Sequence, residues 1–315
     1  MTGIKDQAFG MELEFTGITR REAAQAIAQV INGNKHYDYQ GGAYKKCVVT
    51  SSADGREWVV EYDSSVTTAA GGEQCEFVTP KCTYDDIETV QECIRALRKA
   101  GAKVDPSCGL HIHIDGSKHD AKSIKNLVFT FRAKEDLIFK AVKTQASRLG
   151  RWCKPIDDQL VHNIKQIKTV DNDSIRKTWY GTYRDYGRSE DAHYHGSRYH
   201  ALNLHSLWYR GTVEFRLFEA TLHAGEVRAY ITLCLAMSAA AINAKRASAE
   251  VLDNGNDKYA MRCYLLRLGL IGEEYKNVRL HLLKNLEGNA AWRDDPDTYA
   301  SYRAQRNRGQ AEQPA

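Results

Sequence analysis

The chain has 315 residues, of which 43% are hydrophobic, and this is enough apolar material for one large domain. Its formal net charge of +4 is too small to indicate a nucleic-acid-binding surface. It contains no run of about 18 apolar residues, and Lys5 and Asp6 interrupt its start, so neither a membrane span nor a secretion signal is expected. The 8 cysteines include no CxxC pair, which argues against a zinc-ribbon or thioredoxin-like site and favours a reduced, cytoplasmic protein.

Alternating apolar residues and glycine punctuation predict strands in the first half of the chain. These strands are expected over 9–15, 45–51, 57–63, 73–79 and 110–115. A helix is predicted to begin at the capping box of Thr19 and Glu22 and to end before Gly33. A second helix, with apolar residues at helical spacing, is predicted over 83–100.

Helices are predicted for most of the second half. The longest is expected over 120–149, and shorter ones are expected over 156–169, 224–247, 257–269 and 273–287. Strands are expected over 199–208 and 212–219. The segment 171–198 is polar, aromatic and without clear periodicity, and it is predicted to be a long functional loop or lid.

The order of these elements lacks a regular βαβ repeat. It therefore predicts an α+β fold, in which a mostly antiparallel sheet carries helices on one face. The apolar stretch Tyr230–Ala244 is expected to be a buried helix of this layer.

Acidic and basic side chains recur on one face of the predicted strands, because side chains alternate along a strand. The pairs that share a face are Glu12 with Glu14, Glu61 with Asp63, His111 with His113, and Glu214 with Arg216; Glu76 lies in a strand of its own. Any one such pair is most often a solvated surface or a cross-strand ion pair. These strands place large apolar residues, and no lysine, among the acids, which is unusual for a solvent-facing sheet.

Together, so many carboxylates on one face would repel one another unless cations lie between them. Oxygen ligands with one imidazole suit Mg²⁺ or Mn²⁺ better than Zn²⁺, and Arg216 adds a planar guanidinium that suits a phosphate. The sequence has no Walker A motif, and no GxGxxG follows a predicted strand. A bound nucleotide would therefore have its phosphates held by metals, arginine and histidine.

Five segments, in order along the chain, resemble segments of the glutamine-synthetase-like carboxylate–amine ligases, which include the glutamate–cysteine ligases. They are the Glu-x-Glu strand Gly10–Phe15, the segment Glu76–Pro80, the His-x-His strand Cys108–Ile114, the stretch Arg198–Leu204 and the Glu-x-Arg strand Thr212–Phe218. Each motif alone is weak. The five in this order identify the chain as a member of the amidoligase family of bacteria and their mobile elements.

The resemblance implies a curved sheet whose concave face binds ATP and two or three Mg²⁺ ions, with Mn²⁺ as an alternative. The metal ligands that it implies are Glu12, Glu14, Glu76, His111 and Glu214, together with either Asp63 or Glu61. Asp63 is preferred for that last position, because Asp-x-Ser before the turn is more similar to the relatives.

The resemblance also implies roles for the basic and amide side chains. His113 would contact a nucleotide phosphate, and Asn203 would orient a phosphate or the substrate. Arg216 would face the transferred phosphate, and Arg198 would assist it. Arg216, Arg198 and Glu214 are thus the expected catalytic residues.

The family implies an ATP-dependent ligase that forms an amide or peptide bond through an acyl phosphate. Its substrates would be a small-molecule or peptide carboxylate and an amine, and neither a membrane nor a nucleic acid is an expected partner. We expect a glutamine-synthetase-like catalytic domain over 1–247. A C-terminal helical extension over 248–293 is expected to pack on it, followed by a flexible tail over 294–315.

Three alternatives stay open on the sequence. Relatives on the same fold transfer phosphate without forming an amide, so a phosphotransferase is one of them. A metal-dependent hydrolase would use His111 and His113 as ligands, although no eightfold βα pattern follows them. A binding module without activity would lack some of the acids that this chain retains. The oligomeric state and the identity of both substrates are also open.

Overall fold

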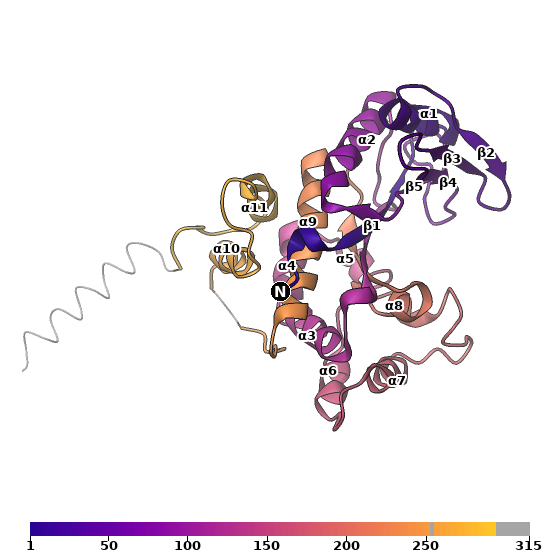
Figure 1. Ribbon diagram of the computed structural model, residues 1–315. Helices are drawn as coiled ribbons and strands as arrows, with labels where there is room; N and C mark the ends of the chain where they lie inside the picture. The colour runs from indigo at the N-terminus through magenta and orange to yellow at the C-terminus, as the bar shows by residue number, and fades with distance from the viewer. Residues whose placement is uncertain (253–254, 294–315) are drawn as a thin grey trace, which may run out of the picture.

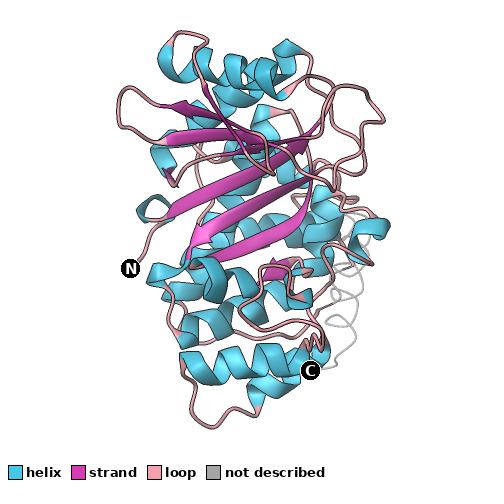
Figure 2. Cartoon of the chain, turned by 90° about the vertical axis from the view of Figure 1, so that its right-hand side faces the viewer, coloured by secondary structure: helices cyan, strands magenta, loops and turns pink. Residues whose placement is uncertain are grey.

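A computed structural model describes residues 1–252 and 255–293 of the chain. Within these residues, nine strands form one open sheet in the order β2-β3-β4-β5-β1-β7-β9-β8, with β6 paired to β1. The strands are β1 (Ala8–Phe15), β2 (Asp38–Gly41), β3 (Lys46–Thr50), β4 (Glu57–Glu61), β5 (Cys75–Val78), β6 (Cys82–Thr83), β7 (Gly109–Asp115), β8 (Leu202–Asn203) and β9 (Thr212–Glu219). Every pairing between them is antiparallel, so the predicted α+β class is confirmed (Figure 2).

Four helices form a layer on one face of the sheet. In this layer α1 contacts α2, α2 contacts α9, and α9 contacts α3 and strand β7; Figure 1 shows α2 and α9 side by side behind β1. The helices are α1 (Arg20–Asn32), α2 (Ile87–Ala100), α3 (Ala121–Arg132), α4 (Glu135–Val142), α5 (Ala146–Leu149), α6 (Asp158–Lys165), α7 (Asn172–Thr182), α8 (His205–Arg210), α9 (Ala224–Asn243), α10 (Asp257–Arg267) and α11 (Lys276–Leu283).

The alternation of β1 separates the apolar layer from the polar face. Met11, Leu13 and Phe15 are at most 1% exposed and belong to the core, whereas Glu12 and Glu14 leave the strand on the opposite side. Each large apolar side chain buried in this way stabilises the fold by about 1.5–3 kcal/mol. The helical layer therefore fixes the strands from behind, and the polar face is held in a set register.

Helix α9 lies at the centre of the helical layer. By length and composition it is the one helix in the described part of the chain that could cross a membrane, and 72% of its apolar window is buried inside the protein. The expected buried helix is thereby confirmed. Helices α10 and α11 lie on the side of α9 away from β1 (Figure 1), where α11 contacts α9 and α4. The domain boundary near residue 247 stays a prediction, and the expected tail over 294–315 falls outside the described residues.

The single helix expected over 120–149 is wrong, because the structure divides it into α3, α4 and α5. Helix α4 ends at Lys143, whose φ of 57° is the left-handed conformation that terminates helices. The next residues turn back to strand β9, where Thr144 Oγ1 donates to Leu217 O at 2.8 Å and Gln145 N donates to Glu219 Oε1 at 3.0 Å. This break directs α5 toward the polar face of the sheet.

Two expectations for 171–208 are also wrong. The predicted loop 171–198 contains α7, which begins where the Asp171 side chain accepts a hydrogen bond from Ser174 N at 2.7 Å. Its apolar face buries Trp179 and Tyr180. The predicted strand 199–208 is reduced to the two residues of β8, and α8 follows it directly. Helix α7 is short and its buried face has few aliphatic residues, so the hydrophobic periodicity of its sequence was too weak to predict a helix.

Glu135 offers a test of this packing that is independent of function. It is 1% exposed and accepts a hydrogen bond from Ile156 N at 2.9 Å, which links α4 to the turn before α6. Burial raises the pKa of Glu135 to about 8 from an ordinary value of 4.5. The folded protein therefore binds an extra proton between these values, and its stability falls as pH rises through that window.

We expect Glu135→Gln to match the wild type in unfolding free energy near pH 5 and to exceed it by on the order of 1–2 kcal/mol near pH 8, because glutamine mimics the protonated acid. Urea unfolding at both pH values measures this. Asp136→Asn, at the exposed neighbouring position, is the control and should show no such divergence. A Glu135→Gln variant that loses stability relative to wild type as pH rises would contradict the assignment.

Candidate active site

The register of the sheet arranges the polar side chains of its open face in three rows that run across the strands. The first row holds Asn203, Glu214 and His113; the second row holds Arg216, His111 and Glu12; the third row holds Glu219, Gly109, Glu14, Glu76 and Glu61. Successive rows are two residues, or about 7 Å, apart along a strand. The predicted site residues from five strands are thus brought onto one surface.

A β-bulge in β9 sets the order of its side chains. Strands β7 and β9 shift register between Leu110 and Ile112, so that Arg216 and Leu217 together lie opposite His111. Glu214 points to the polar face before the bulge, Arg216 does so within it, and Glu219 does so after it. One strand thereby supplies a polar side chain to each of the three rows.

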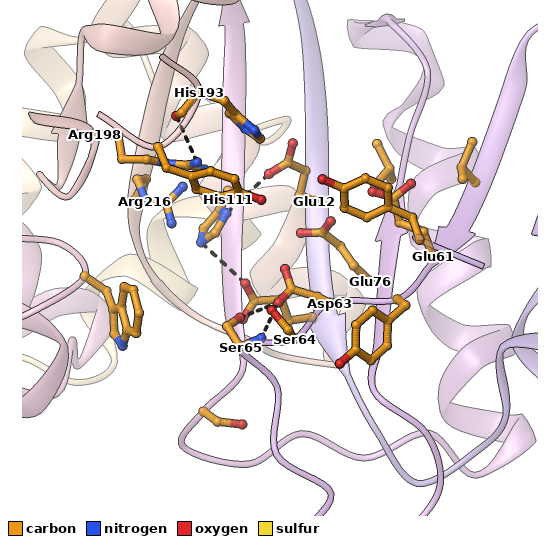
Figure 3. A pocket seen from close by; sticks show the side chains of 18 of the residues that line it. Glu12, Glu61, Asp63, Ser64, Ser65, Glu76, His111, His193, Arg198 and Arg216 are labelled. Atoms are coloured by element: carbon orange, nitrogen blue, oxygen red, sulfur yellow. Dashed lines mark hydrogen bonds and ion pairs between the residues drawn. The ribbon is translucent and has the colours of Figure 1, made fainter. Parts of the chain in front are cut away.

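The carboxylates and imidazoles form three overlapping clusters in which the ligand atoms lie within 4.8 Å of one another. The clusters are Glu12–Glu76–His111, Glu12–His113–Glu214 and Glu14–Asp63–Glu76. They include every residue that the resemblance implied as a metal ligand, with His113 added. Figure 3 shows Glu12, Glu76 and Asp63 converging on the cavity beside His111.

Glu61 and Asp63 both line the cavity, but the structure gives them different partners. Glu61 forms an ion pair with Lys46 at 3.0 Å. Asp63 lies just beyond β4, where it accepts hydrogen bonds from Ser65 N and Ser65 Oγ at 2.6 Å each and completes the third cluster. The turn, and not the alternation of the strand, brings Asp63 to Glu14.

Two carboxylates in this group resist ionisation. Burial, followed by the charges of Glu12, Glu14 and Asp63, raises the pKa of Glu76 well above its usual range. Burial and the nearby Asp63 likewise raise the pKa of Glu14 to about 7. Such crowding is relieved when a cation lies between the oxygens, so the electrostatics favour cation binding at this surface.

In the first and second rows the pKa values are lowered, because a guanidinium lies among the acids and imidazoles. Burial alone would raise the pKa of Glu214, but contact with Arg216 and the neighbouring imidazoles lower it to about 2. Burial and the charge of Arg216 lower the pKa of His111 to about 4. His111 is therefore neutral at physiological pH, which is the form in which imidazole binds a metal.

A cavity of about 720 Å³ opens over these rows, a size common for small-molecule and cofactor sites. The acids Glu12, Glu14, Asp63 and Glu76 line it together with His111. Arg198 and Arg216 form its opposite wall, and Figure 3 places both on the far side of the His111 ring from the acids. His113, Asn203 and Glu214 are buried next to this cavity, at 7%, 1% and 3% exposure.

The sequence matches the family described as "Putative amidoligase enzyme" over residues 5–238, which includes all of the site residues above. The chain belongs to this amidoligase family. Among solved structures it is similar to a bifunctional glutathione synthetase from Pasteurella multocida, with a TM-score of 0.41 and 11% sequence identity. That alignment covers 98% of this chain and 50% of the synthetase, so the chain spans half the length of that protein. A search of curated proteins found no match.

Several side chains of this site were not predicted from the sequence. Arg210, at the end of α8, donates to Glu12 Oε1 at 3.1 Å and to His193 Nε2 at 3.1 Å. His193 and Tyr194 line the cavity from the segment that was predicted to be a lid. Arg148 lines it from α5. None of these residues lies in a motif, and their positions depend on how α5 and α8 pack against β9.

Asn203 has a more restricted position than expected. Its Nδ2 donates to Glu214 Oε2 at 2.6 Å and its Oδ1 accepts from His205 N at 2.9 Å. Both polar ends of the amide are engaged inside the protein. Asn203 therefore holds the Glu214 carboxylate in place, and its expected role in orienting a phosphate or the substrate stays a prediction.

We expect Mn²⁺ to raise the melting temperature of the protein and Glu76→Gln to weaken Mn²⁺ binding at least tenfold, because Glu76 belongs to two clusters. Without metal the variant should be as stable as wild type, since glutamine mimics the protonated acid that burial and the neighbouring carboxylates favour at this position. Calorimetry with Mn²⁺ and thermal melts measure both effects. Glu57→Gln, exposed on the same face of β4, is the control. Equal Mn²⁺ affinity in wild type and Glu76→Gln would exclude Glu76 as a ligand.

Proposed function

We propose that this member of the amidoligase family is an ATP-dependent carboxylate–amine ligase that forms an amide through an acyl phosphate. The observation that carries the proposal is the juxtaposition of three acidic clusters with two arginines, Arg198 and Arg216, around one cavity. Acidic clusters bind divalent cations and arginines bind phosphates. The clusters and the arginines together therefore suit a nucleoside triphosphate bound through metal ions.

The donor set fits magnesium or manganese. Each cluster supplies two or three carboxylates and at most one imidazole, a donor set rich in the oxygen ligands that these ions prefer. His113 Nε2 is buried, has no hydrogen-bond partner within the described residues and lies 3.4 Å from Glu12 Oε1, so it is available to a further ligand. The ligands would be Glu12, Glu14, Asp63, Glu76, His111 and Glu214, and the bound ions would neutralise phosphate charge.

The donor set also argues against a zinc hydrolase that holds one metal between both histidines. His111 and His113 belong to different clusters, and each is accompanied by two acids. Zinc sites in such enzymes combine several nitrogen ligands around one ion.

The arginines are placed to stabilise charge on a phosphoryl group. Arg216 is 6% exposed and contacts Glu214, while its Nε is buried without a partner in the described part of the chain. Arg198 donates to His193 O at 3.2 Å and has no carboxylate within ion-pair distance among the described residues. Both side chains therefore retain donors for oxygens that carry negative charge during transfer.

In the proposed reaction an oxygen of the substrate carboxylate attacks the γ-phosphorus of ATP. The bond from that phosphorus to the bridging oxygen breaks, ADP leaves and an acyl phosphate forms. The amine nitrogen then attacks the acyl carbon, inorganic phosphate leaves, and the nitrogen gives up one proton. Arg198 and Arg216 hold the phosphoryl oxygens through both steps, and Glu214 keeps Arg216 in place.

Arg216→Ala should lower ATP turnover at least a hundredfold, as the loss of a donor to developing charge does in related chemistry. ADP release, measured with a library of acids and amines and with mass detection of the amide, tests this. Because Glu214 is left buried without its partner, the assay is run well below the melting temperature of the variant. Arg151→Ala, exposed near the cavity, is the control. Wild-type turnover in Arg216→Ala would remove Arg216 from the mechanism.

Removal of divalent cations should stop turnover completely, and added Mg²⁺ or Mn²⁺ should restore it. Excess chelator followed by dialysis into each ion measures this. Turnover that persists in chelator would contradict the metal ligands proposed here. ADP release without any amide product would identify a phosphotransferase instead of a ligase.

A further inference from the structure

Arg210 contacts two side chains of the site at once. It is the last residue of α8, and its Nη1 donates to Glu12 Oε1 at 3.1 Å while its Nη2 donates to His193 Nε2 at 3.1 Å. The side chain of Arg210 is 44% exposed, whereas that of Glu12 is 16% exposed. The arginine therefore reaches from the surface of the protein into the cavity, to a carboxylate of β1.

The carboxylate that Arg210 contacts is central to the acidic clusters. Glu12 belongs to two of the three clusters, the one with Glu76 and His111 and the one with His113 and Glu214. Its Oε1, the oxygen that accepts from the arginine, also lies 3.4 Å from His113 Nε2. A divalent ion in either cluster would bring further positive charge close to the guanidinium and compete with it for this carboxylate. An ion pair with so exposed a partner contributes little to stability, so such an ion can displace it.

His193 fixes Arg210 and Arg198 on the same side of the cavity. Its ring stacks on Tyr209, with the ring centroids 5.3 Å apart and the planes 6° apart. Its Nε2 accepts from Arg210, and its backbone O accepts from Arg198 Nη1 at 3.2 Å (Figure 3). Burial and the charges of Arg198 and Arg210 lower the pKa of His193, so its ring is neutral and accepts a hydrogen bond at physiological pH. One residue thus holds two guanidinium groups next to each other.

We propose that Arg210 is a further phosphate-binding residue, which a divalent ion displaces from Glu12 when the nucleotide binds. The inference rests on the site for metal ions and nucleotide proposed above. Without a metal ion, the guanidinium neutralises Glu12. Once an ion occupies a cluster, Arg210 leaves Glu12, stays in contact with His193 and binds a phosphate oxygen beside Arg198.

Lys46 offers a matched contrast to Arg210. It also lines the cavity, its side chain is 41% exposed, and its ion pair with Glu61 spans 3.0 Å. Glu61 is as shielded as Glu12, at 15% exposure, but it belongs to none of the acidic clusters of the described residues. Exchange with a bound metal ion is therefore expected at Arg210 and not at Lys46.

The test measures Mn²⁺ and nucleotide binding to the full chain by calorimetry, without turnover. Arg210→Gln should bind Mn²⁺ about threefold more tightly than wild type, because the competing ion pair is removed. At saturating Mn²⁺ the same variant should bind a non-hydrolysable ATP analogue about tenfold more weakly, because a phosphate contact is lost. Lys46→Gln should match wild type in both affinities. A merely structural defect would weaken both ligands, so two changes of opposite sign identify the exchange.

Three results would overturn the proposal: an Arg210→Gln variant that binds Mn²⁺ no more tightly than wild type, one that binds the analogue as tightly as wild type, or an equal gain in Mn²⁺ affinity in Lys46→Gln. If Arg210→Gln does not fold, Arg210→Lys replaces it, since lysine lacks the planar fork and should show both changes at reduced size. The two opposite changes in a protein without ATP turnover would refute the ligase and leave the exchange standing. Turnover with unchanged affinities in Arg210→Gln would do the reverse.

Discussion

Glu12, Glu14 and Glu76 lie on a sheet that holds their carboxylates at fixed spacing, with an apolar layer of helices directly behind them. The backbone pairing of β1 with β5 prevents these groups from moving apart, and burial prevents water from screening their charges. Such a group of acids is tolerated only with protons or cations among them. The site therefore requires positive charge close to these carboxylates.

The cations that the chain does provide come from its least regular part. Arg148, Arg198 and Arg210 belong to the excursion between β7 and β9, which returns to the sheet edge through several short helices. Arg210 donates to Glu12 on β1 and Arg148 donates to Arg216 O on β9, so these hydrogen bonds tie the excursion to the sheet. A binding site is thus divided between a rigid acidic floor and a basic wall whose position depends on packing between short elements.

This division explains which residues of the site could be placed from the sequence and which could not. Strand alternation was sufficient to place Glu12, Glu14, His111 and Glu214 on one face, because a period of two residues is readable without tertiary information. Arg148 could not be found in that way, because a left-handed Lys143 breaks the expected helix and turns α5 toward β9. Asp63 could not be separated from Glu61 by alternation either, since a turn beyond the strand decides which acid reaches Glu14.

The β-bulge at Arg216 and Leu217 allows Glu214 and Glu219, which are an odd number of positions apart, to reach the same face of the sheet. If the bulge were lost while every residue was kept, simple alternation would bring Phe218 to the polar surface and Glu219 into the core. Homologous chains should therefore change the spacing between Glu214 and Glu219 by one residue only where the bulge is also lost, whereas the β2–β3 hairpin, whose residues are largely exposed, can accept insertions independently. The spacing of these two glutamates and the presence of the bulge are thus expected to vary together among natural variants of the protein.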